Sequence, residues 1–365
     1  MRKVVIGTSV ALTGVVFAWG VLCLPQFGAR AGGERLERMN ASPNFLGGKA
    51  QNVVFTKTAT MTEMMPVVKE YLDRGVERFP TGEIPIVRPD PETMILGEGL
   101  HLTWMGHSSM LLDLDGTTVL TDPVFSERAS PFESSGPLRF HPTPLAVEEL
   151  PPIDVVLLSH DHYDHLDHAT IAELASRDTR FVAPLGVGAH LESWGVPAEN
   201  ITELDWGESV LVNTVRFHCT PARHFSGRGL ADRNNTLWAS WAMVGPEHRV
   251  WFSGDTGPFE EAAAIGEEHG PFDLTMIEIG AWNAAWGDVH LGPEGALEMH
   301  ELLGGAVMMP IHWGTFELST HAWDQPIQKV QELAEERGVT LLSPLPGQRV
   351  SPAAPEVARF WKDRT

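Results

Sequence analysis

The sequence predicts a layered α/β fold with helices outside buried sheets. Short apolar runs of strand length alternate with helical stretches along most of the chain. Several of these runs are continuous rather than alternating, which is typical of strands that are covered on both faces. We find no repeat of fixed short period and no second domain boundary. The runs that predict strands are 110–114, 118–120, 155–158, 215–219, 250–252, 276–279 and 307–311.

The composition excludes several classes of protein. With 43% hydrophobic and 20% charged residues among 365, the chain has the ordinary balance of a globular protein, which excludes disorder and a coiled coil. A formal net charge of −22 and the lack of a basic run argue against binding to nucleic acid. The two cysteines, Cys23 and Cys219, provide neither a disulfide framework nor a cysteine-based zinc site. Any metal therefore has to be bound by histidines and carboxylates.

Residues 1–33 are predicted to be a membrane-directed segment. Arg2 and Lys3 precede an uncharged run, 4–24, whose length as a helix matches the roughly 30 Å of a bilayer core at about 1.5 Å per residue. This length favours an uncleaved signal anchor, whereas the Ala-Arg-Ala sequence at 29–31 leaves a cleaved signal peptide as the alternative. In both cases the body is exported across the cytoplasmic membrane. We therefore expect a membrane-anchored or periplasmic protein.

The rest of the chain divides into an arm, a main domain and a tail. Residues 34–99 are rich in Gly, Pro and Asn and are predicted to form a linker and covering arm. The main α/β domain is expected over residues 100–350, and residues 351–365 are expected to be a carboxy-terminal tail. One amphipathic helix is predicted within the arm, with its apolar face formed by Met64, Val67, Val68, Tyr71 and Leu72.

Potential metal ligands directly follow four of the predicted strands. Because the strand ends of one sheet converge on one rim, ligands from separate segments can point into a single cleft. The strand at 155–158 is followed by a dense group of ligands, and those at 215–219, 250–252 and 307–311 by one ligand each. The seven candidate metal ligands are His160, His162, Asp164, His165, His224, Asp255 and His312.

The His-x-His-x-Asp-His motif at 160–165 is the most specific signal in the chain. Its first two histidines can converge on one metal ion while its Asp and last His turn toward a neighbouring position, so the spacing suits two ions better than one. A dinuclear zinc site activates a water near neutral pH and stabilises both ends of a displacement. Histidine and carboxylate ligands suit zinc, with iron or manganese as alternatives. The competing interpretation of the motif is a solvated, histidine-rich loop.

Other residues are candidates for supporting roles. His290 has no predicted strand before it, and we place it near the site as a hydrogen-bond donor to substrate, with a plain surface histidine as the alternative. His107 and Asp122 are candidates for orienting the metal ligands, or are ordinary turn residues. Cys219 is expected in the core, since no base accompanies it in the sequence. The other histidines are interpreted as surface or hydrogen-bonded residues, and they include His101, His141, His190, His248, His269, His300 and His321.

The order of these motifs resembles the metallo-β-lactamase superfamily, in which a His-x-His-x-Asp-His cluster is followed by a His, a Gly-Asp-Thr and a final His. A closer resemblance, over roughly residues 100–345, is to the branch of N-acyl-phosphatidylethanolamine-hydrolysing phospholipases D. The stretches that carry the closer resemblance are LTDPVFS at 120–126, residues 159–167, NTLW at 235–238 with SW at 240–241, GDTG at 254–257, GPFDL at 270–274 and IHWGTF at 311–316.

The resemblance implies a four-layer αββα sandwich and two zinc ions per chain. It also places His290 where the family has a histidine that lines the active site. Two departures from the family pattern, Asp161 and the stretch 282–286, flank the cleft and concern the lipid preference rather than the metal site. The implied ligands are His160, His162 and His224 for one zinc, Asp164, His165 and His312 for the other, and Asp255 as a bridge between them.

The expected function is that of a dinuclear zinc hydrolase of phospholipase D type. We expect a zinc-bridging hydroxide to attack an N-acylphosphatidylethanolamine-like lipid, with Asp164 and His290 as catalytic residues. The alternative in the same chemistry is a lactonase or another carboxylic-ester hydrolase. The expected partners are a lipid or small ester and, through the amino-terminal segment, a membrane. Three tryptophans are candidates for holding an acyl chain or for core positions, namely Trp282, Trp286 and Trp313.

Two rival functions belong to other classes. An iron site for redox chemistry is expected to have Glu at the second histidine of the motif, where this chain has His162. A binding or scaffold protein could have kept the fold without the chemistry, but the presence of all seven candidate ligands argues against it. The sequence therefore favours a hydrolase.

Overall fold

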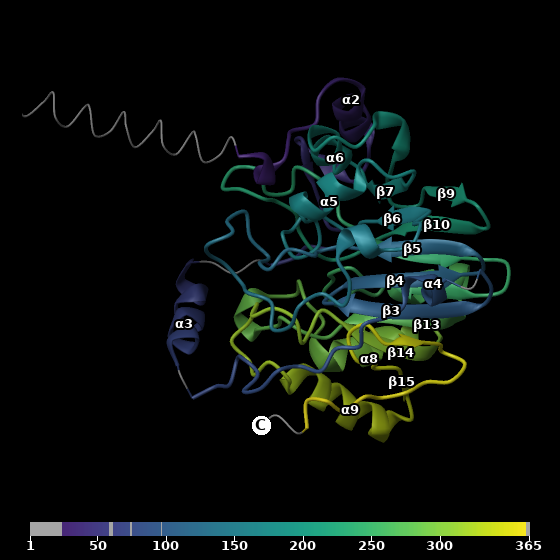
Figure 1. Cartoon of the computed structure of the whole chain (residues 1–365). Helices are drawn as coiled ribbons and strands as arrows, with labels where there is room; N and C mark the ends of the chain where they lie inside the picture. Colours follow the sequence, from purple (N-terminus) through teal and green to yellow (C-terminus); the bar gives the residue numbers. More distant parts are fainter. Residues whose placement is uncertain (1–23, 58–60, 74, 96, 363–365) are drawn as a thin grey trace, which may run out of the picture.

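The computed structural model describes residues 24–57, 61–73, 75–95 and 97–362, and it contains two seven-stranded sheets packed face to face (Figure 1). Helices cover the outer face of each sheet, which gives the four layers αββα that the sequence predicts. Most of the membrane-directed segment expected at 1–33 lies outside the described residues. Within the described part of the chain, no helix combines the length and apolar character that crossing a membrane requires.

The first sheet is built from the amino-terminal half of the domain and one strand from its carboxy-terminal end. In spatial order its strands are β16 (Arg349–Val350), β3 (Leu100–Gly106), β4 (Ser109–Leu114), β5 (Thr117–Thr121), β6 (Val155–Leu157), β7 (Arg180–Pro184) and β8 (Ile201–Leu204). Neighbours from β16 to β5 are antiparallel, and those from β5 to β8 are parallel. The carboxyl ends of β3, β5 and β6 therefore lie at the same edge of the sheet.

The second sheet repeats this division into a parallel and an antiparallel half. In spatial order its strands are β15 (Thr340–Leu341), β14 (Gly305–Ile311), β13 (Phe272–Glu278), β12 (Arg249–Phe252), β11 (Ser240–Val244), β10 (Val215–Thr220) and β9 (Ser209–Val212). Pairing is parallel from β15 to β12 and antiparallel from β12 to β9. The carboxyl ends of β10, β12, β13 and β14 therefore share one edge.

Side chains from both sheets form the main core between them. Trp104 and Met110 of the first sheet belong to the same buried cluster as Phe217, Trp241 and Trp251 of the second. Removing a large apolar side chain from water stabilises the fold by about 1.5–3 kcal/mol. The strands β4, β5 and β6 are buried at every position, as their continuous apolar sequences predict.

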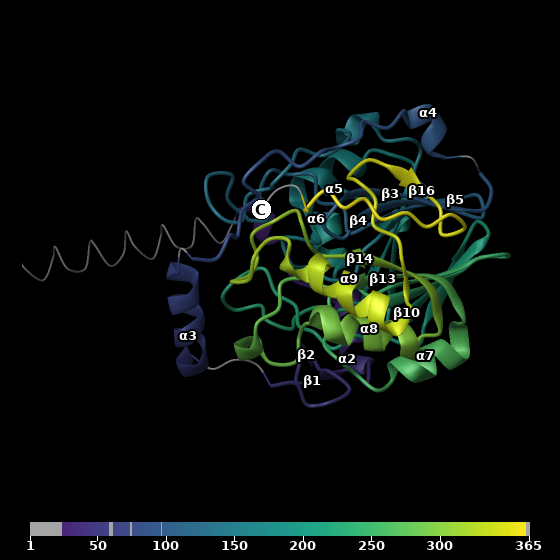
Figure 2. The ribbon, with the colours of Figure 1, turned by 90° about the horizontal axis from the view of Figure 1, so that it is seen from below.

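Separate sets of helices cover the two outer faces. α5 (His168–Leu174) and α6 (Gly188–Ser193) cover the first sheet, where Ile171 and Leu191 pack in a second apolar cluster with Leu120. The second sheet is covered by helices that lie side by side in Figure 2, namely α7 (Ala262–His269), α8 (Gly292–Leu302) and α9 (Gln325–Arg337).

Each of the seven apolar runs forms part of a strand, so these strand predictions are confirmed. The runs did not indicate β3, β7, β8, β9, β11, β15 or β16. Several of these strands are short or have partly exposed residues, as in β8 and β9, so no continuous apolar run marks them. Pairing with neighbouring strands, which the local sequence does not show, decides their conformation.

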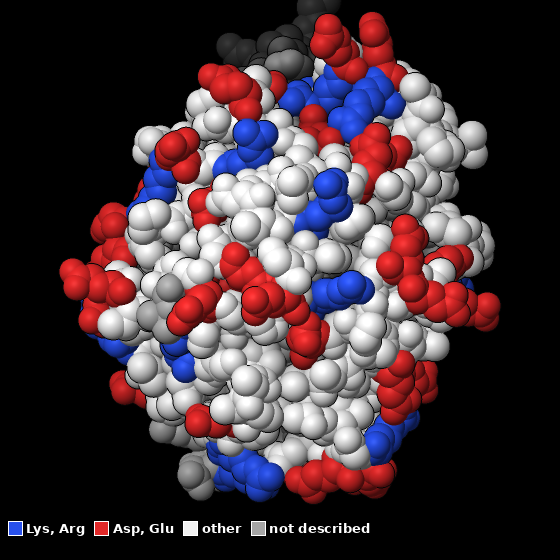
Figure 3. Space-filling model, turned by 90° about the vertical axis from the view of Figure 1, so that its right-hand side faces the viewer, with Lys and Arg blue, Asp and Glu red and all other residues white. Residues whose placement is uncertain are grey.

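The arm contacts the body through its first helix. In spatial and chain order the arm contains α2 (Gly33–Ala41), β1 (Phe45–Leu46), β2 (Lys49–Ala50), α3 (Met61–Leu72) and α4 (Pro91–Met94). Arg35 of α2 forms ion pairs with Glu192 and Glu203, at 2.9 and 2.5 Å. Basic and acidic side chains lie close together in this region, at the top of Figure 3, and acidic side chains are spread over the rest of the face shown.

The predicted amphipathic helix forms as α3, but its apolar face largely lacks contact with the body. The helix stands to one side of the sheets in both ribbon views (Figures 1 and 2). Val67 is buried, whereas Val68 and Leu72 are 51% and 76% exposed, and Tyr71 is also exposed. The periodicity thus predicts the helix correctly, and the side chains of Val68, Tyr71 and Leu72 on its apolar face are exposed.

Residues after 350, expected to be a tail, contribute to the core. The Phe360 ring stacks on Trp313 with 5.7 Å between the ring centroids, and Trp361 is completely buried. Both aromatic rings belong to the cluster between the sheets. The folded domain therefore extends past residue 350.

Replacing Trp361 by Ala should lower the free energy of unfolding by about 3–5 kcal/mol, because it leaves a large cavity in the main core. Equilibrium unfolding in urea measures this loss. The matched control is Leu211→Ala on β9, whose side chain is 55% exposed, and which should change the stability by no more than about 0.5 kcal/mol. Equal stability of the two variants would show that the carboxy-terminal residues do not support the core.

Candidate metal centre

Most residues of the candidate site directly follow strands that run in the same direction. His107 follows β3, Asp122 follows β5, the motif at 160–165 follows β6, His224 follows β10, Asp255 follows β12 and His312 follows β14. Since the carboxyl ends of such strands share one edge of each sheet, the fold gathers these side chains at a single place. All seven predicted ligands meet there, and all are buried except the partly exposed His162 and Asp164.

The backbone bends sharply where three of these strands end. His107, Asp122 and His312 have φ values of 55°, 34° and 63°, in the left-handed region that residues other than glycine rarely adopt. Such conformations persist only when the surrounding structure enforces them, and they cluster at functional sites. Here the bend turns each side chain from the end of its strand into the space between the two sheets.

The first cluster of ligands contains three histidines and Asp255. His160 Nε2 lies 2.9 Å from His162 Nδ1, and His224 Nε2 lies 3.3 Å from that same nitrogen. His160 Nε2 and His224 Nε2 are 3.8 and 3.7 Å from Asp255 Oδ2. Three imidazole nitrogens and one carboxylate oxygen therefore face a common point, which is the donor set of a zinc site.

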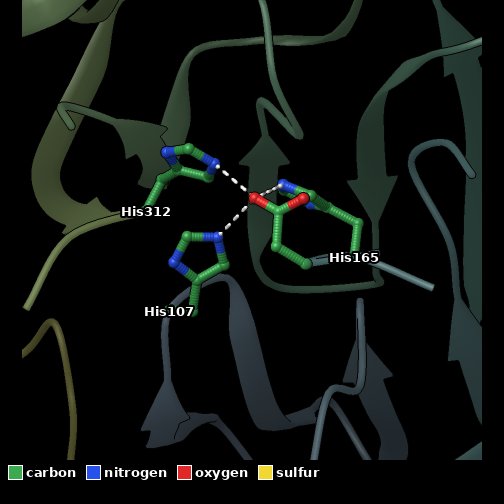
Figure 4. Close-up of side chains that lie close together, drawn as sticks. His107, His165 and His312 are labelled. Carbon is green, nitrogen blue, oxygen red and sulfur yellow. Dashed lines mark hydrogen bonds and ion pairs between the residues drawn. The ribbon is translucent and has the colours of Figure 1, made fainter. Parts of the chain in front are cut away.

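The second cluster surrounds Asp164. Its Oδ2 lies 3.1 Å from His107 Nε2, 3.2 Å from His312 Nε2 and 3.5 Å from His165 Nε2. Figure 4 shows the rings of these three histidines pointing toward one another from separate parts of the chain. His107, which the sequence suggested only as an orienting residue, is thus as close to the cluster as the predicted ligands.

Asp255 joins the two clusters. Its Oδ2 faces the first cluster, while its Oδ1 lies 3.2 Å from both His165 Nε2 and His312 Nε2 in the second. One buried carboxylate therefore offers one oxygen to each donor set. This arrangement favours two neighbouring cations over a single one.

Charge and burial act differently on the two clusters. Burial lowers the pKa of His160 and His224 well below the usual histidine value, and neighbouring histidines lower it further, so both rings are neutral as metal ligands must be. Burial also opposes protonation of His312, but the charge of Asp255 and the hydrogen bonds to Asp164 and Asp255 together outweigh burial and raise the pKa to about 10. Burial would raise the pKa of Asp255, yet His165 and His312 hold it well below its usual range.

The donor atoms fit a metal centre because some of them have no other partner. His165 Nε2 and Asp255 Oδ1 are buried without a hydrogen bond, although they lie 3.2 Å apart. Buried polar atoms are normally satisfied, and an unpaired one carries a penalty of about 1–3 kcal/mol. A divalent cation between the clusters would satisfy both atoms and replace the protons that now balance the carboxylates.

Outer hydrogen bonds orient the ligand rings. Asp122 is completely buried and accepts from Ser159 N and Oγ, and it lies 2.6 Å from His165 Nδ1. His224 Nδ1 lies 2.9 Å from the Val289 carbonyl oxygen, which requires a hydrogen on Nδ1 and leaves Nε2 free to face the site. Such partners fix the tautomer and orientation of metal-bound histidines. The geometry of Asp122 matches its expected orienting role.

His290 lies beside both clusters, and its partner Glu278 was not predicted. The His290 ring is 5.2 Å from that of His224 and 5.5 Å from that of His312. Its Nδ1 lies 3.1 Å from Glu278 Oε2, and Glu278 also accepts from Leu291 N at 3.0 Å. Burial opposes the protonated form of His290, but the charge of Glu278, the hydrogen bond to it and the charge of Asp255 together outweigh burial and raise the pKa. Glu278 ends β13 and lies inside the run 276–279 that predicts this strand, so a single carboxylate within an otherwise apolar run was the signal that could have found it.

Several residues expected outside the site pack elsewhere. Cys219 is buried, as predicted. His300 is buried and hydrogen-bonded to Thr275, whereas His190 is buried against Asp161 rather than at the surface. Of the tryptophans, Trp313 is a core residue, and the other two are partly exposed, with the Trp286 ring 6.1 Å from His290.

Comparison with known proteins identifies the family. A family model described as a beta-lactamase superfamily domain matches residues 117–313, more than half of the chain. The chain belongs to the metallo-β-lactamase superfamily. Divalent metal binding follows from this membership, and the two clusters of His and Asp side chains are groups that could hold the metal.

Two relatives are similar to this metallo-β-lactamase superfamily member in sequence, and one solved structure is similar to it in fold. An uncharacterised protein of Mycobacterium tuberculosis is 46% identical over 328 residues, which cover 88% of this chain and 87% of the relative. N-acyl-phosphatidylethanolamine-hydrolyzing phospholipase D 1 of Caenorhabditis elegans is 36% identical and covers 76% of this chain and 80% of its own, which places the chain in that branch of the superfamily. An isothiocyanate hydrolase from Delia radicum gut bacteria shares the fold, with a TM-score of 0.56, 20% identity, and coverage of 69% and 98%.

Replacing Asp122 by Asn should weaken zinc binding by about 10–100-fold, because His165 loses the carboxylate that orients its ring. Competition with a chromogenic chelator measures the affinity. Asp154→Asn is the matched control, since Asp154 Oδ2 accepts a hydrogen bond from Thr118 N on the same sheet but lies outside the clusters. Equal zinc affinities of the two variants would contradict an orienting role for Asp122.

Proposed function

We propose that the protein is a dinuclear zinc hydrolase, and specifically a phosphodiesterase of phospholipase D type that acts on N-acylphosphatidylethanolamine-like lipids. The observation that carries the dinuclear part is the split of Asp255 between two donor clusters. The phosphodiesterase part is supported by the relationship to the nematode phospholipase D and to a yeast mitochondrial one that is 32% identical over 246 residues.

The proposed metal ligands divide by cluster. The carboxylate of Asp255 contributes to both positions, and His107 adds a fourth side chain at the second position. Iron or manganese would fit the same donors, so zinc is part of the proposal. The other ligands are His160, His162 and His224 at the first position and Asp164, His165 and His312 at the second.

The protein's own residues prepare the site for an anionic substrate. When bound, two zinc ions supply Lewis acidity and lower the pKa of water. The neutral rings of the first cluster are ready to bind metal without losing a proton. His290, whose pKa Glu278 helps to raise, lies beside both clusters, where its protonated form can donate a hydrogen bond to a phosphoryl oxygen as negative charge builds up.

Apolar rings at the edge of the site support a substrate with an acyl chain. Phe225 is partly exposed, and its ring centroid lies 4.6 Å from His162 and 4.7 Å from His224. Trp286 is also partly exposed, and its ring centroid lies 6.1 Å from that of His290. An apolar chain packed on these rings would keep water away from the reacting phosphate.

Export and membrane attachment are also part of the proposal. They rest on the apolar run 4–24 behind Arg2 and Lys3, which precedes the described body. A membrane-held enzyme meets lipid substrates at high local concentration. The lipid and the membrane are therefore the partners that we propose.

A substrate panel tests the proposed function. The full-length chain in detergent is assayed with N-acylphosphatidylethanolamine, a simple aryl phosphodiester and a set of lactones, after its bound zinc is measured. Release of phosphatidic acid from the lipid supports the proposal. Hydrolysis of lactones without hydrolysis of either diester would overturn it in favour of a carboxylic-ester hydrolase, and less than one metal ion per chain would contradict the dinuclear site.

Replacing Asp164 by Asn should abolish diesterase activity while the fold remains nearly intact. The loss of activity should exceed the roughly 10–100-fold effect of removing a residue that only hydrogen-bonds a metal ligand, as Asp122 does. The reason is that Asp164 is itself at the centre of the second cluster. Steady-state kinetics and near-ultraviolet circular dichroism measure activity and fold. Asp178→Asn, at an exposed position, is the control and should retain full activity. Unchanged turnover of the Asp164 variant would refute the assignment.

Replacing Glu278 by Gln should move the alkaline limit of activity to lower pH. In the native protein, Glu278 raises the pKa of His290, so the ring stays a protonated donor until the pH exceeds that raised value. Without the Glu278 charge, His290 loses its proton at lower pH, and activity at alkaline pH should fall toward the loss of about 10²–10³-fold expected for removing one such donor. A pH profile of kcat measures the shift, and a profile that coincides with that of the native enzyme would contradict it.

A further inference from the structure

A strap formed by residues 25–31 lies against the loop that carries the His-x-His-x-Asp-His motif. It begins with the 3-10 helix η1 (Pro25–Phe27). The Phe27 ring meets Tyr163 of the motif edge-on, with 6.4 Å between the centroids. The Trp194 ring nitrogen donates to the Pro25 carbonyl oxygen at 2.7 Å. The strap is therefore fixed both to the loop and to the layer of helices on the first sheet.

Arg228 connects the strap to both ends of the loop. Its side chain is only 3% exposed. Nη1 donates to the carbonyl oxygens of Asp161 and Leu166, at 2.7 and 2.8 Å, on either side of the last three predicted ligands of the motif. Nε and Nη2 donate to the Gln26 carbonyl oxygen of the strap, at 2.9 and 2.7 Å. A buried guanidinium needs an acceptor for each of its N–H groups. The Gln26 carbonyl oxygen is the acceptor for the edge of the guanidinium formed by Nε and Nη2.

His190 provides a second connection. Ala29 N donates to His190 Nδ1 at 3.0 Å, which leaves the ring hydrogen on Nε2, 3.4 Å from Asp161 Oδ2. The Asp161 carboxylate also accepts from Gly227 N and from Thr236 Oγ1, both at 2.7 Å. Asp161, which departs from the family pattern, thus serves a network that reaches the strap and fixes the backbone between the first two histidines of the motif.

We propose that the strap is a working part of the metal centre, because it holds Arg228 and His190 in the positions from which they set the geometry of the motif loop. Arg228 is then a positioning residue, and the strap supplies its missing acceptor. This inference rests on the proposed dinuclear site. It also requires that residues 25–31 stay attached to the mature protein, since a cut after Ala31 would remove every contact that the strap makes with Arg228, His190, Trp194 and Tyr163.

Gly28 allows the strap to be displaced without changing Arg228 or a ligand. Its φ is 73°, and a Cβ added to it would lie 2.0 Å from His190 Nδ1, so Gly28→Ala cannot keep the present contact. Gly48→Ala is a matched control, because Gly48 has a φ of 74° and nothing within 4 Å of an added Cβ. Both variants meet the same backbone strain, and only the first one displaces the strap.

The experiment compares the full-length native chain, Gly28→Ala, Gly48→Ala, Arg228→Gln and Arg228→Lys. Zinc affinity is measured by chelator competition, and the visible absorption of the cobalt-substituted protein reports the ligand geometry independently of any substrate. We expect Gly28→Ala and Arg228→Gln to weaken zinc binding by about 10–100-fold and to change the cobalt spectrum. Arg228→Lys should restore part of the affinity, while Gly48→Ala should match the native chain.

Two results would overturn the inference. The first is that Gly28→Ala keeps the native cobalt spectrum and has a zinc affinity within twofold of that of Gly48→Ala. This result decides the question even if Arg228→Gln fails to fold. The second is an active, zinc-loaded chain from native membranes whose amino-terminal sequence begins at Gly32, whereas a chain that still contains Pro25 supports the inference. Failure of the native chain to bind two metal ions would instead count against the proposed metal centre.

Discussion

The buried carboxylate of Asp255 is the interaction on which the arrangement of the two sheets depends. It follows a strand of the second sheet, and its oxygens face His160 and His165 from the first sheet as well as His224 and His312 from its own. A charge with almost no exposure is stable only beside compensating charges or donors. Asp255 therefore joins residues that follow strands of both sheets, and the site lies where the two sheets meet at this edge.

The rest of the site follows from strand direction and from a layer of supporting carboxylates. Strands of one direction deliver their following residues to one edge, and the left-handed backbone at His107 and His312 turns two of these side chains inward. Asp122 and Glu278 then each bind one histidine, so that only one nitrogen of each ring faces the clusters. The strands themselves are mostly apolar and buried, and the polar side chains of the site lie at and just beyond their carboxyl ends.

The local sequence could predict those strands and ligands for which a single continuous segment contains all the residues of the pattern. An apolar run followed at once by a ligand identified the ends of β6, β10, β12 and β14. Glu278 escaped notice because it reads as the last residue of a strand, and its partner His290 lies in a loop without periodicity. The periodicity of α3 has a related limit, since it indicates an apolar face but not what covers it, and Val68, Tyr71 and Leu72 are exposed. The contact between Gln26 and Arg228 joins residues about 200 positions apart, and no spacing rule reports such a pair.

The charge of the chain and the position of the strap together bear on how a lipid reaches the site. In the proposed dinuclear form, two divalent cations would outweigh the charges of Asp164 and Asp255, so the metal centre would attract an anionic substrate although the chain carries a net charge of −22. The acidic surface elsewhere does not favour adhesion to anionic headgroups, which leaves apolar contact as the source of membrane proximity. Pro25 directly follows the apolar run 4–24, and the strap that it begins contacts Tyr163 through Phe27. In the proposed anchored form, the chain thus leaves the membrane beside the metal loop, and a lipid in that membrane has only a short path to the site.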